Sequence, residues 1–427
     1  MNRAGSASAH QRQAGSASVR QTPTASVRQT HAASGHPTLA ASTRQTHADS
    51  ALQQAVETAL TFPADLDERI ARHLRFWGPA YEGEGLYVIA RAPRAGWEKA
   101  TRLDAAKPVP SSLHEQWLDV DFALRKLEYE LASVYLGGDG LPIAMPNLGP
   151  GIIPGLVGHP FALTQRSIWF DQNPFDDPAA LADLHFDPNT EFYRVYTEFN
   201  DRLLERAEGR YFVAQSDFGS CFDTLASLLR RDDLLAEVAL DPARVSAWIG
   251  GLFGLWDDAL RANRELISTR QPLQSNWIPL VNDRIWYSLI SEVSSMISRQ
   301  AYEEIALPAL LREAAQFEQV IFNLDGDTAA RHVDLVCTIP QLHAIFWAPT
   351  VKYSRERPFY QDLLAPESLA VCRTVQEHAK LLIDGIQPWQ LADFLKQVSP
   401  DGLFLIVDCG SQIEAEEVLA SLRRWIH

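Results

Sequence analysis

Short apolar runs alternate with amphipathic stretches from about residue 85 to the end of the chain, and this alternation predicts an α/β fold. The runs have the length of buried strands, and the clearest are residues 85–90, 141–145, 320–322, 344–347 and 403–407. A single (β/α)8 TIM barrel fits this pattern, with residues 85–90 and 403–407 pairing as its first and last strands. The alternative is a doubly wound open sheet, although no Gly-x-Gly-x-x-Gly turn follows any run.

Residues 1–50 break this pattern, because they carry almost no large apolar side chains. They repeat the strings Ala-Gly-Ser-Ala-Ser and Arg-Gln-Thr, and their five arginines face a single acidic residue, Asp49. Such a segment cannot bury enough apolar surface to offset the entropy lost on ordering. We therefore expect a disordered leader over residues 1–50 and one barrel domain over residues 51–427.

The composition narrows the class of protein. The chain has 427 residues, 46% of them hydrophobic, and a net charge of −16, so it can bury a large core and is poorly matched to nucleic acid or an anionic membrane. Its four cysteines form no Cys-x-x-Cys pair, and no apolar run approaches the length of a membrane span or a secretory signal. We expect a cytoplasmic protein with a small-molecule substrate.

Polar and aromatic side chains follow many of the apolar runs, at the end of the strand where α/β folds build their sites. Since all strands of a parallel barrel point the same way, these side chains should converge on one rim. We expect the catalytic groups to be Asp217, Glu292 and Asp325. The expected substrate-binding residues are Asn147, Trp169, Asp171, Asn323 and Trp347. Carboxylates gathered in this way repel one another, so at least one should hold a proton or a cation and have a raised pKa.

The stretch from Val320 to Trp347 is the most informative of these strand ends. A buried run is followed at once by Asn323 and Asp325, and Gly326 leaves the backbone beside Asp325 open to a ligand. Asp325 is therefore expected at the polar centre of the site. Asp327 lies next to a helix start and fits the ordinary role of a helix cap.

The same stretch resembles a signature of the uroporphyrinogen decarboxylase-like superfamily, in which Leu-Asp-Gly is followed by Arg-His-x-Asp, Ile-Pro and a Trp. Three further stretches resemble segments of this superfamily, and they lie at residues 135–151, 211–229 and 296–308. The superfamily contains uroporphyrinogen decarboxylases, corrinoid methyltransferases and cobalamin-independent methionine synthase, and all of them are (β/α)8 barrels. The resemblance therefore implies the same barrel for this chain.

The resemblance leaves the reaction open. It implies a methyltransferase that uses a corrinoid, carried by a partner protein, or a related methyl donor. A decarboxylase of a porphyrinogen-like molecule is the second reading, and a barrel that only binds is the third. The corrinoid enzymes hold zinc through a His-x-Cys pair and a later Cys, and the matching positions here offer only Asp325 and Cys409 as ligands, with the neutral Asn323 in place of His.

Overall fold

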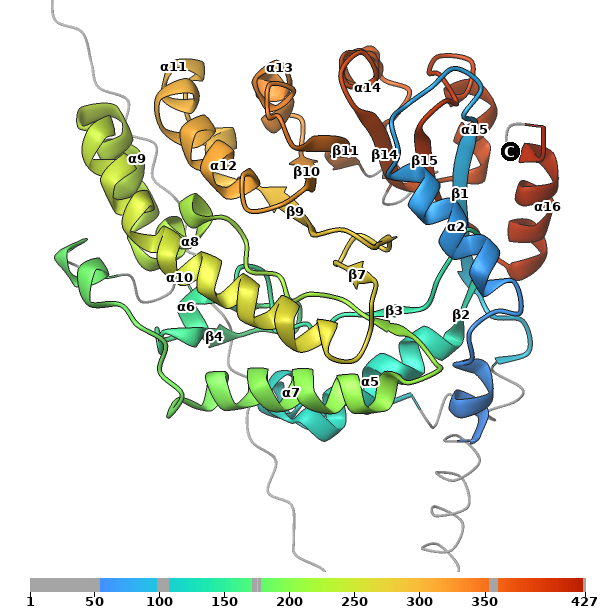
Figure 1. The fold of residues 1–427 in the computed structure, drawn as a ribbon, viewed down its shortest axis with the longest axis horizontal. Coiled ribbons are helices and arrows are strands. Elements are labelled where there is room, and N and C mark those ends of the chain that lie inside the picture. The colour runs from blue at the N-terminus through green and yellow to red at the C-terminus, as the bar shows by residue number, and fades with distance from the viewer. Residues whose placement is uncertain (1–53, 98–106, 171–174, 176–177, 353–359, 425–427) are drawn as a thin grey trace, which may run out of the picture. The chain divides into compact units, whose positions relative to one another are not determined.

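The computed structural model describes residues 54–97, 107–170, 175, 178–352 and 360–424. The expected leader, residues 1–50, and the expected site residue Asp171 lie outside these ranges. The described residues belong to one compact unit, whose elements are drawn in Figure 1. Among them, no helix is both long and apolar enough to cross a membrane.

A seven-stranded sheet with the order β2-β1-β15-β14-β11-β10-β9 is the framework of the fold. Its strands are β1 (Leu86–Pro93), β2 (Val134–Gly138), β9 (Trp286–Ile290), β10 (Gln319–Asp325), β11 (Leu342–Ala348), β14 (Lys380–Ile386) and β15 (Leu403–Asp408). All neighbours pair in parallel except β2, which runs antiparallel to β1. The expected pairing of the first and last long strands is confirmed, since Leu86 of β1 lies opposite Leu403 of β15.

Shorter strands form separate two-stranded sheets. They are β3 (Ile143–Ala144) with β6 (Phe212–Val213), which are parallel, and the antiparallel pairs β4 (Ala162–Leu163) with β5 (Ile168–Trp169), β7 (Gln274–Ser275) with β8 (Val281–Asn282), and β12 (Val351–Lys352) with β13 (Tyr360–Gln361). The expected α/β class is confirmed. A continuous ring of hydrogen-bonded strands, as in a closed barrel, is not seen among the described residues.

Strand β2 accounts for this difference, because it occupies the edge of β1 where a parallel strand was expected. Its glycines allow the close approach. A Cβ atom on Gly138, whose φ is +65°, would lie 2.3 Å from the carbonyl oxygen of Val88. The following residue, Asp139, accepts the backbone N–H of Val88 through its carboxylate at 2.7 Å.

The two faces of the large sheet belong to two hydrophobic cores. Tyr87 and Ile89 of β1 lie in an inner core, together with Phe76 and Trp77 and with every second residue of the neighbouring strands. Val88, which points the other way, lies in an outer core between the sheet and the helices. Every second strand residue therefore faces the interior. The same alternation determines which polar side chains at the strand ends face the interior.

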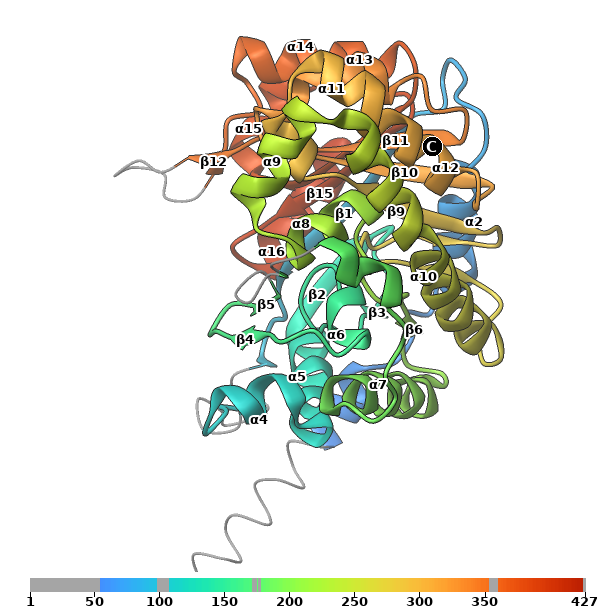
Figure 2. The same cartoon turned by 90° about the vertical axis from the view of Figure 1, so that its left-hand side faces the viewer.

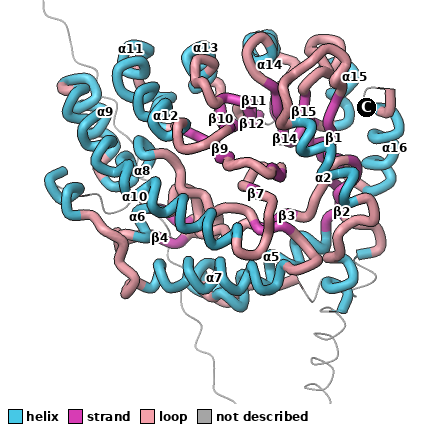
Figure 3. The backbone as a smooth tube through the Cα atoms, in the orientation of Figure 1, coloured by secondary structure: helices cyan, strands magenta, loops and turns pink. Residues whose placement is uncertain are grey.

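Helices surround the strands, as the tube drawing in Figure 3 and the turned view in Figure 2 show. Helix α2 (Leu66–Phe76) differs from the others, because its Phe76 lies in the inner core. The other helices are α4 (Leu113–Leu118), α5 (Val120–Ser133), α6 (Ile153–Leu156), α7 (Glu191–Ala207), α8 (Cys221–Leu228), α9 (Arg231–Leu240), α10 (Pro242–Ser268), α11 (Arg299–Ala301), α12 (Leu307–Ala314), α13 (Val333–Val336), α14 (Pro366–Gln376), α15 (Pro388–Phe394) and α16 (Gln412–Leu422). Short 3₁₀ segments lie at Pro178–Asp183, Val293–Met296 and Ala329–His332, and Tyr302–Ala306 is one turn of π-helix.

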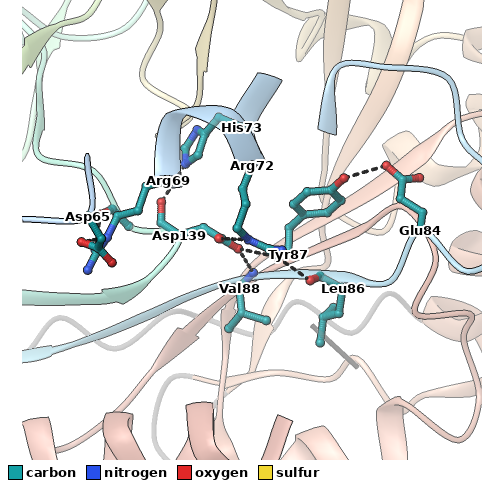
Figure 4. A network of polar contacts seen from close by, with 10 residues as sticks. Asp65, Arg69, Arg72, His73, Glu84, Leu86, Tyr87, Val88 and Asp139 are labelled. Atoms are coloured by element: carbon teal, nitrogen blue, oxygen red, sulfur yellow. Dashed lines mark hydrogen bonds and ion pairs between the residues drawn. The ribbon is translucent and has the colours of Figure 1, made fainter. Parts of the chain in front are cut away.

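Helix α2 is fixed to the strands by the polar network of Figure 4. The guanidinium of Arg72 forms an ion pair with Asp139 and donates to the carbonyl oxygen of Leu86 at 3.0 Å. His73 Nε2 lies 2.7 Å from the carbonyl oxygen of Asp139. These contacts secure the amino-terminal end of β1, so the opposite ends of the strands are left for a site.

Candidate functional site

A cavity of about 370 Å³ lies where β5, the loop after β6, the start of α8 and the loops after β9 and β10 meet. Its described lining includes four carboxyl groups and one basic side chain: Asp217, Asp223, Glu292, Asp325 and Arg231. Trp169 and Met296 contribute apolar surface, and both are partly exposed to solvent. The three expected catalytic carboxylates are thus in one place, although nearly 110 residues separate the first from the last.

Asp217 is held by two loops that touch through their glycines. Its Oδ1 accepts the backbone N–H of Gly219 at 3.0 Å, and its carbonyl oxygen accepts the N–H of Ile152 at 3.1 Å. Gly219 has a φ of +64°, and a Cβ atom there would lie 3.2 Å from the Cα of Gly151. A larger residue at Gly219 would press against the other loop, whereas Gly151 is favoured by its positive φ of +62°. The glycines thereby help to set the position of this carboxylate.

Asp223, in the first turn of α8, positions the neighbouring strand end. Its carboxylate accepts the backbone N–H groups of Glu292 and Val293 at 3.0 and 2.9 Å, and the hydroxyl of Ser220 at 3.0 Å. Ser220 in turn caps α8, since its Oγ accepts the N–H of Asp223. One aspartate thereby joins the start of α8 to the segment that carries Glu292.

Asp325 ends β10 and is exposed at the cavity wall. The next residue, Gly326, turns the chain with a φ of +79° and donates its N–H to the carbonyl oxygen of Ala348 at 2.8 Å. Gly326 lines the cavity beside Asp325. Asp327 instead faces the next loop, where its Oδ1 accepts the N–H of Thr350.

The electrostatics of the cavity follow from its excess of acidic groups. The pKa of Asp217 is raised to about 6, mainly by burial and also by the charge of Asp223, although backbone N–H groups lower it. The pKa of Glu292 is raised to about 7, first by burial and then by the charges of Asp223, Asp325 and Asp217, whereas Arg231 lowers it. Burial also raises the pKa of Asp325. The expected raised pKa values are therefore present.

A small recess opens beside this cavity and shares Glu292 and Asp325 with it. Asn323 lines the recess, 8% exposed, and its Oδ1 accepts no hydrogen bond from the described residues. Asn323 precedes Asp325 by two positions on β10, so both side chains lie on the same face of the strand.

Other expected site residues lie elsewhere. Trp347 is 1% exposed and packs in the outer core, because its position on β11 points toward the helices and away from the interior. Asn147 is exposed, and its Oδ1 accepts the N–H of Gly149 at 3.0 Å in a local turn. Neither lines the cavity. Trp169 does, but from the small β4–β5 hairpin and not from a strand of the main sheet.

The expected zinc ligands do not come together. Cys409 follows β15 and is buried, with its Sγ 3.9 Å from the carbonyl oxygen of Val407, and it is absent from the described cavity lining that contains Asp325. Within the described ranges, no group of three or more His, Cys, Asp or Glu side chains is placed to hold a metal ion. The residues present therefore do not fit the zinc site implied by the resemblance.

Sequence reasoning missed two members of the cavity and a second polar cluster. Asp223 sits inside a helix pattern and Arg231 begins the next helix, so neither follows an apolar run. The second cluster joins Arg91 to Asp384 and Asp408, at 2.8 and 2.7 Å, across the ends of β1, β14 and β15. Its signal was readable, since Asp384 is followed by Gly as Asp325 is.

Comparisons with known proteins find a likeness in fold but no relative by sequence. No protein-family model matches the chain, and no curated protein matches it by sequence. Among solved structures, a methyltransferase from Methanosarcina mazei resembles it with a TM-score of 0.50 and 9% sequence identity, over 83% of this chain and 98% of that one. At this identity the likeness shows that the two chains share an overall fold.

Proposed function

We propose that this chain is a small-molecule methyltransferase of the uroporphyrinogen decarboxylase-like superfamily, and that Asp217 is its general base. The observation that carries the proposal is the group of four carboxyls in one cavity, with the pKa of Asp217 raised to about 6. A base with a pKa near the working pH is ionised and still a useful proton acceptor. The fold likeness to a methyltransferase and the sequence motifs support the reaction class.

In this reaction an acceptor X–H loses its proton to the Asp217 carboxylate as X attacks the methyl carbon. The bond between that carbon and the donor breaks, and its electron pair leaves with the donor. The resemblance implies a corrinoid, carried by a partner protein, or a related compound as donor. No zinc ion takes part in the proposed step, because the residues present do not fit one.

Decarboxylation of a polycarboxylated porphyrinogen is less well matched to this cavity. Such a substrate needs cationic side chains, and Arg231 is the basic group in the described lining against four carboxyls.

The strands fit a (β/α)8 barrel in which the β3–β6 pair completes the ring between β2 and β9. We propose this barrel as the full architecture.

The test is methyl transfer from methylcobalamin to a panel of small thiols, amines and hydroxy compounds, measured with the purified full-length protein. We expect the rate to rise with pH through about 6, and Asp217→Asn to lower it by about 10²-fold. Glu304→Gln, an exposed change outside the cavity, is the control and should leave the rate unchanged.

Three results would contradict the proposal. Release of CO₂ from a porphyrinogen without methyl transfer would identify a decarboxylase. Ligand binding with no turnover of any donor would identify a binding protein on this fold. Full activity of the Asp217→Asn variant would show that another residue is the general base.

A further inference from the structure

The recess beside the cavity is defined by a buried acceptor and two carboxylates. It has a volume of about 10 Å³, and Glu292 and Asp325 form its border with the main cavity. A space of this size admits one group about as large as a water molecule. Asn323 lies within it, with its Oδ1 lacking a donor from the described residues.

Leaving a buried acceptor unpaired is unfavourable, so most such atoms in proteins have a donor. Ser291, 6% exposed, lines the same recess, and its hydroxyl, which can donate or accept, has no hydrogen-bond partner among the described residues. Because the Oδ1 of Asn323 can only accept, a ligand group that donates a hydrogen bond would satisfy it. This observation is independent of the charge of the surrounding carboxylates.

The carboxylates set the charge of that group. Glu292 and Asp325 are near enough for the charge of Asp325 to raise the pKa of Glu292, and the charges of Asp223 and Asp217 act in the same direction. A neutral donor would satisfy Asn323 and leave this repulsion in place. A cationic donor would both donate a hydrogen bond to Asn323 and offset the repulsion between the carboxylates.

The size and donor count then select among cations. A quaternary ammonium has no N–H to donate, and a guanidinium is a planar fork of five donors that exceeds the recess. A primary ammonium is compact and carries three donors. It matches the number of acceptor groups that the lining residues Asn323, Glu292 and Asp325 supply.

We propose that the substrate carries a primary ammonium group, which the recess binds through Asn323, Glu292 and Asp325. The inference rests on the proposed function, because it describes the substrate of the same cavity. The ammonium is an anchor and not the methyl acceptor, since its nitrogen lone pair is occupied by a proton. It holds the rest of the molecule in the main cavity, near Asp217 and the indole of Trp169.

The test uses methylammonium as the probe and the full-length protein, with calorimetric titration as the measurement. We expect binding at pH 8, and binding at least tenfold weaker at pH 5.5, where Glu292 is protonated. Tetramethylammonium should not bind. Asp325→Asn and Asn323→Leu should each weaken methylammonium binding at least tenfold, whereas Asn323→Asp keeps an acceptor in place and should retain it.

Asp327→Asn is the matched control, because it removes one carboxylate two positions along the same loop and outside the cavity lining. Equal binding of tetramethylammonium, or unchanged affinity in both Asp325→Asn and Asn323→Leu, would overturn the inference. So would binding of Mg²⁺ in place of methylammonium with the same dependence on these residues. If methylammonium fails to bind but Asp217→Asn still abolishes methyl transfer, the ammonium anchor is wrong and the proposed function stands.

Discussion

At the scale of single residues, Asp217 shows how burying a carboxyl group makes the stability of the fold depend on pH. Its carboxyl is partly buried between two glycine-containing loops, and this burial raises its pKa from 3.8 to about 6. The folded state therefore binds the proton more tightly than the unfolded state does. The stability associated with the protonated form is complete below about pH 4 and is lost as the pH rises through about 6.

Asp217→Asn should abolish this loss, because the amide stays neutral at every pH. Relative to the wild type, the free energy of unfolding of the variant should increase by about 1 kcal/mol between pH 5 and pH 8. Urea unfolding at the two pH values measures the change. Asp327→Asn, in the neighbouring loop, controls for the loss of one charge, and identical changes in the two variants would show that the effect is not specific to the cavity.

The positions of Asp217, Glu292 and Asp325 could be predicted because each follows an apolar run that is a strand or its continuation. The same rule was wrong for Trp347, since it takes no account of the face on which a side chain lies. Trp347 and Asp325 both stand at strand ends, but Trp347 occupies the outer-core series of β11. Counting in steps of two from the inner-core residue Phe346 would have placed Trp347 on the helix side.

At the scale of elements, a buried ion pair joins β14 to the loop before β1 at the amino ends of the strands. Lys380 pairs with Glu84, and both residues are less than 5% exposed. The ammonium of Lys380 also donates to the carbonyl oxygen of Phe76 at 2.6 Å, and the hydroxyl of Tyr87 donates to Glu84 at 2.8 Å. The remaining carboxylate oxygen of Glu84 accepts no hydrogen bond from the described residues.

Lys380→Met should lower the free energy of unfolding by about 3–5 kcal/mol, because it leaves the Glu84 carboxylate buried without a counter-charge. The double change Lys380→Met and Glu84→Gln removes that charge and should recover part of the loss. Lys396→Met, which breaks an exposed pair with Asp393, should change stability by less than about 0.5 kcal/mol. Equal losses in the single and double variants would mean that packing, and not charge, is responsible.

The elements that were hardest to predict from the sequence are those whose conformation depends on contacts with distant segments of the chain. The pattern of residues 243–267 predicts a long helix, and these residues form most of α10. The sequence from Ser167 to Phe170 is strand-like, but only Ile168–Trp169 forms a strand, in a hairpin with β4. Strand β2 was not predicted, because its Tyr-Leu-Gly-Gly sequence lacks a strand pattern and its extended form depends on pairing with β1.

At the scale of the whole molecule, β1 and β15 bring early and late parts of the described chain together in one sheet. Six consecutive residue pairs join them, from Leu86 with Leu403 to Arg91 with Asp408. The outer core likewise contains residues from Val56 to Leu422. Because both halves of the chain contribute residues to the same core, neither should fold alone. We therefore expect a single cooperative transition when thermal unfolding is measured by calorimetry. Two stable fragments with separate transitions after limited proteolysis would contradict this.

The start of that core gives a sharp test of the expected leader. Residues 1–50 carry almost no large apolar side chains, so a chain that begins at Ala51 should keep its melting temperature. The next buried residues are Val56 and Leu60, 8% and 2% exposed. A chain that begins at Pro63 loses both, at roughly 1.5–3 kcal/mol for each fully buried side chain, and should melt several degrees lower. If the chain from Ala51 already shows that drop, residues 1–50 stabilise the fold and the expected boundary is wrong.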